Sequence, residues 1–157
     1  MNAVEIEEAI SQLAEQDFDP DSFPFAFLEA FGNKPTTIRR LKSKRNSSNS
    51  SDIEGGVLQR NNIHIAVCEE GKVTETLDKL KASPATTKAK AKYVLATDGI
   101  TLEAEDLKSG DTIACQYPHF PDHFGFFLSL AGISTVKEIR NNAIDITSRY
   151  RSVNRSE

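Results

Sequence analysis

Apolar residues recur every three or four positions at the start of the chain. This spacing over residues 4–14, with glutamates between the apolar positions, predicts an amphipathic helix. A second helix is predicted over residues 23–32, because large apolar side chains precede Gly32, a residue type that often ends helices. A third helix, over residues 35–45, starts at Pro35, which suits a first helical turn.

After residue 55, the apolar positions gather into short runs of the length of β-strands. Residues 55–60 and 61–68 predict a hairpin, because Asn61 and Asn62 tolerate the positive φ angles of a type I′ turn. The remaining predicted elements are a helix at 73–83, a basic extended approach at 85–92, a strand at 93–99, a hairpin at 100–107 and 111–117, a mixed loop and aromatic helix at 118–132, and a helix at 134–146. This order predicts an α/β or α+β fold with a mixed central sheet flanked by helices.

The length and composition indicate one globular domain. The chain has 157 residues, of which 38% are hydrophobic and 27% charged. We predict a single domain over residues 1–146, with a mobile serine- and asparagine-rich loop at 46–52. Residues 147–157 would form a disordered tail or the start of a connector to further domains.

Cysteine usage and hydropathy bear on the compartment. Cys68 and Cys115 lie in apolar runs, which favours buried thiols in a reducing environment over a disulfide. The sequence has no secretion signal and no run of about 20 apolar residues. We therefore predict a cytoplasmic protein with no membrane partner.

A net charge of −4 excludes a uniformly basic nucleic-acid-binding chain, so any DNA contact must come from a local patch. One candidate patch lies at the end of the third predicted helix and comprises Arg39, Arg40, Lys42, Lys44 and Arg45. Lys88, Lys90 and Lys92 would share a face of an extended segment and form a second candidate. The alternative is a solvated helix end, where cations are favoured without any ligand.

Carboxylates and a lysine near the first hairpin suggest a metal-dependent nuclease. Such an enzyme needs acids that hold Mg²⁺ and a lysine that activates water. The literal match is Asp52 with Glu70 and Lys72, completed by Glu29 from a preceding helix. Glu70 and Lys72 flank a glycine, however, so we expect them in a turn after the strand, where such residues are common and solvated.

Histidines offer a weaker metal site. His119, Asp122 and His123 include three potential ligands, but their spacing is irregular and phenylalanines surround them, so packing or loop-tying roles are favoured and we predict no metal. His64 alternates with Ile63 and Ile65, so its side chain should point away from theirs.

Several stretches together resemble a known protein family. The stretches are "FAFLEAFG", "GGVLQRNNIHIAVC", "YVLATDG" with "LEAEDL", and "FPDHFGFFLSLAGIST". They resemble the amino-terminal module of MmeI-like S-adenosylmethionine-dependent DNA methyltransferases, which are bifunctional type II restriction-modification enzymes. In restriction-competent members this module is a PD-(D/E)xK nuclease, so the resemblance implies a PD-(D/E)xK nuclease-like fold here.

The resemblance also implies that the catalytic positions have been lost. Glu29 matches the glutamate of the family's helix, but the hairpin positions that hold the other acids and the lysine correspond to Val57, Val67 and Glu69. Valine cannot bind Mg²⁺, and glutamate cannot replace the lysine. The glycine-rich methyl-donor loop and the catalytic motif of the methyltransferase are absent as well, so S-adenosylmethionine would bind in the parent protein outside this chain.

Three functions follow as hypotheses. The favoured one is a catalytically degenerate nuclease-like module of an adenine-specific DNA methyltransferase, which helps to bind DNA or to position the parent's remaining domains. The alternative is an active Mg²⁺-dependent endonuclease that uses Glu29, Asp52, Glu70 and Lys72. A third is a protein-interaction domain with residues 120–130 as an exposed aromatic docking surface, although aromatic clusters are more often core.

Overall fold

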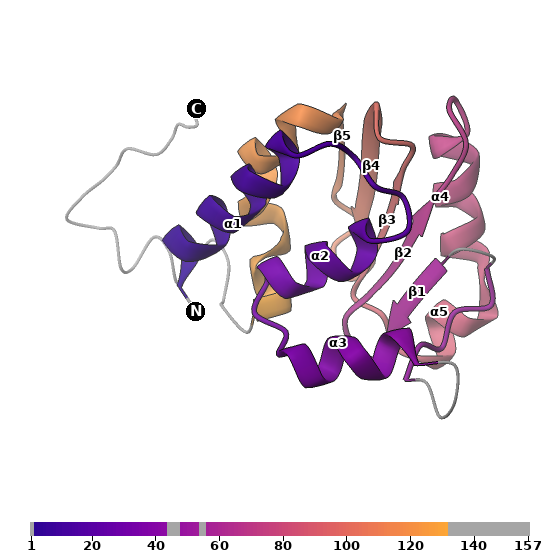
Figure 1. The fold of residues 1–157 in the computed structure, drawn as a ribbon. Helices are drawn as coiled ribbons and strands as arrows, with labels where there is room; N and C mark the ends of the chain where they lie inside the picture. The colour runs from indigo at the N-terminus through magenta and orange to yellow at the C-terminus, as the bar shows by residue number, and fades with distance from the viewer. Residues whose placement is uncertain (1, 44–47, 54–55, 132–157) are drawn as a thin grey trace.

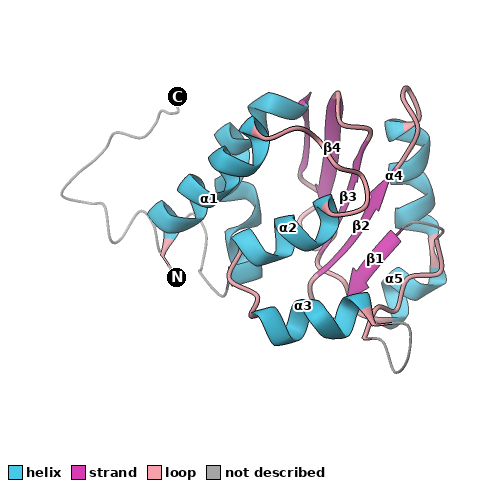
Figure 2. Ribbon diagram, viewed as in Figure 1, coloured by secondary structure: helices cyan, strands magenta, loops and turns pink. Residues whose placement is uncertain are grey.

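The computed structural model describes residues 2–43, 48–53 and 56–131 as a sheet with helices on both faces (Figures 1 and 2). The strands are β1 (Gly56–Gln59), β2 (Ile63–Val67), β3 (Tyr93–Thr97), β4 (Thr101–Asp106) and β5 (Thr112–Gln116). They lie in the order β1-β2-β3-β4-β5. The β2–β3 pair is parallel and the other three pairs are antiparallel. The predicted α/β class with a mixed central sheet is therefore confirmed.

Four helices cover one face of the sheet: α1 (Ala3–Glu15), α2 (Phe23–Ala30), α3 (Pro35–Lys42) and the 3₁₀ segment η1 (Tyr117–Ala131). Their core is aromatic, since Phe23, Phe27, Phe31, Phe120 and Phe127 are at most 1% exposed. Ring centroids of Phe27 and Phe127 lie 5.3 Å apart, edge to face. The prediction that the aromatic segment is core is confirmed, and the alternative of an exposed docking surface is wrong.

The helices α4 (Val73–Ala82) and α5 (Pro84–Lys88) connect the two parallel strands and lie on the opposite face. Apolar side chains of α4 pack there against Ala66 of β2 and Val94 of β3. Because side chains alternate along a strand, Ile63 and Ile65 join the aromatic core while His64 points to the α4 and α5 side. This orientation of His64 was predicted.

Two local predictions are wrong. The segment predicted as extended contains α5, because Pro84 occupies the first helical position and the Ser83 side chain accepts a hydrogen bond from the Ala85 N–H. Lys88 therefore lies in a helix and does not share an extended face with Lys90. The first hairpin has three loop residues, since Gln59 pairs with Ile63, and of its two asparagines only Asn61 has a positive φ.

Residues 48–53 run beside the free edge of β1. The Asn49 Oδ1 accepts the Leu58 N–H at 2.9 Å, and the Ser50 N–H donates to the Leu58 carbonyl at 3.1 Å. These bonds satisfy β1 groups that an uncovered edge strand would expose. The rest of the predicted mobile loop (46–47), the predicted final helix and the predicted tail lie outside the described residues.

Candidate functional site: a valine-lined cavity, a histidine cluster and basic surfaces

A cavity of about 530 Å³ lies where α2, α3 and the β1–β2 hairpin meet. Val57 of β1 and Val67 of β2 line it, together with Phe25 of α2 and Leu41 of α3. Both valines belong to the sheet face that α2 covers, since Val57 pairs with Ile65 and Val67 lies two positions further along β2. The structure therefore brings together two of the three positions that the family resemblance singled out in the sequence.

Neither position offers a metal ligand. Val57 is 4% exposed and Val67 is half-buried, so both are packed against the aromatic core. Glu69, at the third matching position, is exposed beyond the end of β2. Mg²⁺ requires oxygen ligands, which aliphatic side chains cannot supply.

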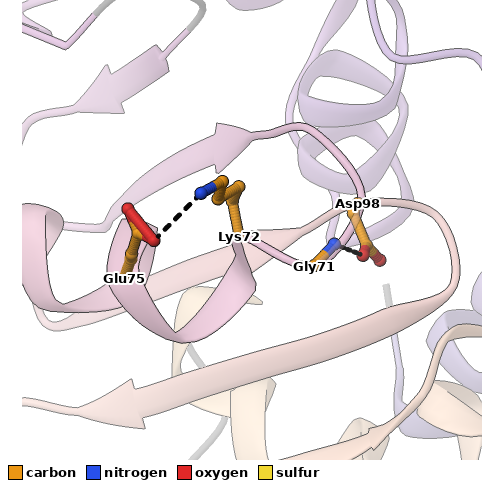
Figure 3. Close-up of polar contacts among 4 residues, drawn as sticks. All are labelled: Gly71, Lys72, Glu75 and Asp98. Carbon is orange, nitrogen blue, oxygen red and sulfur yellow. Dashed lines mark hydrogen bonds and ion pairs between the residues drawn. The ribbon is translucent and has the colours of Figure 1, made fainter.

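The literal Glu-x-Lys pair lies in the turn between β2 and α4, as predicted. Figure 3 shows Lys72 directed toward Glu75, with its Nζ 3.5 Å from the Glu75 Oε1. The Gly71 N–H donates to the Asp98 Oδ2 at 2.9 Å and closes the turn against the end of β3. Partial burial acts to raise the pKa of Asp98, but hydrogen bonds from backbone N–H groups, including those of Thr101, Gly71 and Ile100, together hold it below its usual value. Lys72 is therefore part of an exposed helix start rather than of a metal cleft.

Asp52 and Glu29, the other two candidate nuclease residues, lie far from this turn. The Asp52 Oδ1 accepts a hydrogen bond from the Ser83 hydroxyl at 2.6 Å, at the far end of α4 from Lys72. This bond holds the pKa of Asp52 below its usual value. The 10 residues of α4 separate the two ends by about 15 Å. Glu29 is exposed on α2, on the opposite side of the sheet from α4.

The structure thus does not bring Asp52 together with Lys72 or with Glu29. Across residues 2–43, 48–53 and 56–131, no group of three or more His, Cys, Asp and Glu side chains has a metal-binding arrangement. The sequence candidates His119 and Asp122 are exposed on η1, and His123 is half-buried there.

Sequence reasoning missed a polar cluster around His64, which is fully buried. The His64 Nδ1 lies 2.8 Å from the Thr86 Oγ1, and its Nε2 lies 2.7 Å from the Ser51 Oγ. The Thr86 hydroxyl donates its proton to the Leu80 carbonyl at 2.7 Å, so the Thr86 oxygen accepts a hydrogen bond from His64. The imidazole N–H is therefore at Nδ1. The Nε2 then accepts the Ser51 hydroxyl proton. Burial lowers the pKa of His64 from 6.5 to about 4.

This cluster joins the loop before β1, strand β2 and helix α5. A serine hydroxyl donating to a histidine is also the arrangement that activates a nucleophile. Here, however, the Ser51 Oγ also accepts the Ile53 N–H at 3.1 Å, and it lies so close to Gly56 that a Cβ there would clash with it. Ser51 therefore already has several hydrogen-bond partners, and the cluster holds the loop before β1 against β2 and α5.

The predicted basic positions are exposed where the structure describes them. Arg39, Arg40 and Lys42 lie in the last turn of α3, with the Lys42 Nζ 5.1 Å from the Phe25 ring centroid. Lys44 and Arg45 lie outside the described residues. Lys88 and Lys90 are exposed at the end of α5. The ion pairs among the described residues are Lys72–Glu75 and Lys81–Glu105, so none of these five cations pairs with a carboxylate in that part of the chain.

Comparison with known proteins identifies the family. The family described as "MmeI, N-terminal domain" matches residues 1–148. The chain belongs to this family. The resemblance seen in the sequence is thereby confirmed.

A curated relative gives the family its context. DNA methyltransferase A from Bacillus subtilis (strain 168) is 26% identical over 151 residues, which is 96% of this chain and 17% of the relative. The chain thus spans about a sixth of that relative's length. No solved structure matches this chain. No helix within the described residues is long and apolar enough to cross a membrane.

Proposed function

We propose that this chain is a non-cleaving, nuclease-like N-terminal module of a DNA methyltransferase, which binds DNA and positions the parent's remaining domains on it. The observation that carries the proposal is that Val57 and Val67, which the family resemblance matches to metal-holding positions, line one cavity and offer no metal ligand. The parent would be an adenine-specific enzyme of a restriction-modification system, and its S-adenosylmethionine would bind outside this chain.

The chemistry of the cleft supports the non-cleaving role. Hydrolysis of a phosphodiester at neutral pH needs a metal ion or an equivalent cation to stabilise the developing negative charge. Val57 and Val67 provide no oxygen ligand, and Glu69 adds negative charge where the lysine would stand. These three positions would therefore supply neither the metal ligands nor the lysine that activation of a phosphodiester needs.

The basic end of α3 supports DNA binding. Arg39 and Arg40 are exposed and have no carboxylate partner among the described residues, although the chain as a whole carries a net charge of −4. Unneutralised cations on an acidic protein concentrate positive potential in one place, where phosphates release bound counterions on contact. Such contact is independent of DNA sequence and orients a neighbouring domain that reads the bases.

Binding of labelled duplex DNA to the whole protein at several salt concentrations tests the DNA part. We expect Arg39→Gln with Arg40→Gln to reduce the slope of log K against log salt by about 2. The matched control is Lys79→Gln with Lys108→Gln, which removes the same charge from exposed sites on α4 and after β4. Equal effects of the two double variants would refute a specific role for α3.

Plasmid nicking with Mg²⁺ or Mn²⁺ tests the non-cleaving part. We expect no metal-dependent cleavage by the whole protein. Cleavage that disappears in Glu70→Ala or Lys72→Ala would overturn the proposal in favour of the endonuclease alternative.

A further inference from the structure

A second group of cations meets at one end of the sheet. The Asn61 N–H donates to the Ala89 carbonyl at 2.8 Å, which holds the β1–β2 turn against the end of α5. The Lys92 N–H donates to the Asn62 carbonyl at 2.7 Å, which places the approach to β3 beside the same turn. We call the resulting exposed group the basic corner, and it consists of Arg60, Lys88, Lys90 and Lys92.

Acidic residues are scarce around the basic corner. Residues 56–68 and 84–97, which form it, contain no aspartate or glutamate. The adjacent acid is Asp106, which pairs with Tyr93 across β3 and β4 and accepts the Lys108 and Ser109 N–H groups. Neither ion pair among the described residues involves the four cations. The corner is therefore a concentrated positive surface on an acidic chain.

The backbone at Lys90 provides an independent observation. Lys90 follows Ala89, the C-cap residue of α5, and has a φ of 57°, in the left-handed region. The following residue, Ala91, donates its N–H to the Thr86 carbonyl at 3.1 Å, as at a helix end that normally carries glycine. A lysine in this conformation costs stability that a glycine would not. Backbone strain of this kind points to a role for the side chain.

We propose that the basic corner binds the phosphate backbone of duplex DNA, as a contact distinct from the end of α3. The proposal rests on the proposed function, in which DNA is the partner. The lysine ammonium groups are compact charges on flexible stems, and the Arg60 guanidinium is a planar fork of donors. Both kinds of group bind phosphate oxygens, and phosphate contacts carry no sequence information. The corner would therefore add affinity that falls with salt and does not depend on the DNA sequence.

Lys90→Gly separates binding from folding. Glycine relieves the left-handed strain, so the midpoint of thermal unfolding should stay the same or rise. Loss of the ammonium group should nevertheless weaken binding of a labelled duplex to the whole protein and reduce the slope of log K against log salt by about 1. A residue with only a structural role would not produce this combination.

A charge-matched pair of double variants completes the experiment. Arg60→Gln with Lys88→Gln should lower the slope by about 2, whereas Lys72→Gln with Lys79→Gln, at exposed positions before and on α4, should leave it nearly unchanged. If the corner variants match this control while the α3 variants weaken binding, the corner proposal is overturned and the proposed function stands. If no variant alters salt-sensitive binding, or none is detected, both proposals fall.

Discussion

The buried, neutral His64 should make the stability of the protein fall in mild acid. Its pKa lies near 4 in the folded protein and near 6.5 when exposed. Above pH 6.5 both states are neutral, but as the pH falls toward 4 the unfolded chain takes up a proton that the folded chain does not, and folding weakens. At about 1.4 kcal/mol per pKa unit, the free energy of unfolding falls by at most about 3 kcal/mol. Solvent screening near the loop before β1 reduces this loss to about 2 kcal/mol.

Urea unfolding at pH 7 and at pH 4.5 measures this effect, with His64→Gln as the matched variant. Glutamine has no titrating group, but it offers a donor and an acceptor to Thr86 and Ser51. We expect the free energy of unfolding of the wild type to drop by about 2 kcal/mol across this range and that of the variant to drop clearly less. Equal drops would show that His64 does not carry the acid sensitivity, and the buried neutral assignment would then be wrong.

Three further variants test the packing and the candidate site. Gly56→Ala should lower the free energy of unfolding by about 1–3 kcal/mol, because the new Cβ collides with the Ser51 Oγ, and an unchanged urea midpoint would contradict this. Phe127→Ala, in the aromatic core, should cost about 3–5 kcal/mol in the same assay, whereas a loss below about 1 kcal/mol would place it outside the core. Lys72→Ala should change stability by less than about 0.5 kcal/mol, because its pair with Glu75 is exposed, and a larger loss would refute this reading.

The elements that the sequence predicted well are those with strong local signals. Gly32 ends its helical region with a φ of 99°, and Gly110 turns the second hairpin with a φ of 83°, as their residue type suggested. The helix α5 was missed because the alternating lysines that begin at its last residue, Lys88, imitate the two-residue period of a strand. The local signal that marks its start, Ser83 followed by Pro84, was present but belongs to a helix of only five residues.

The candidate site was only partly visible in the sequence. The positions Val57 and Val67 were identified through family resemblance, and the strand register then placed both beside one cavity. The partners of His64 come from 13 positions before it and 22 positions after it, a separation that no periodicity reveals. Likewise, the contact of Asp52 with Ser83 joins residues 31 positions apart and shows why the literal acid set does not assemble.

The valines that line the cavity also explain why a metal site would be hard to introduce there one residue at a time. Val57 is 4% exposed, and an aspartate at its position would bury a carboxylate, which costs several kcal/mol without a cation or hydrogen-bond donors beside it. A bound metal ion offsets that cost only when the second acid and the surrounding ligands are already present. With Val67 and Glu69 at the other positions, a single Val57→Asp change would lower stability and gain no metal site. Under the proposed function, packing at Val57 takes the place of metal binding, while DNA contact falls to the exposed cations on α3 and at the basic corner.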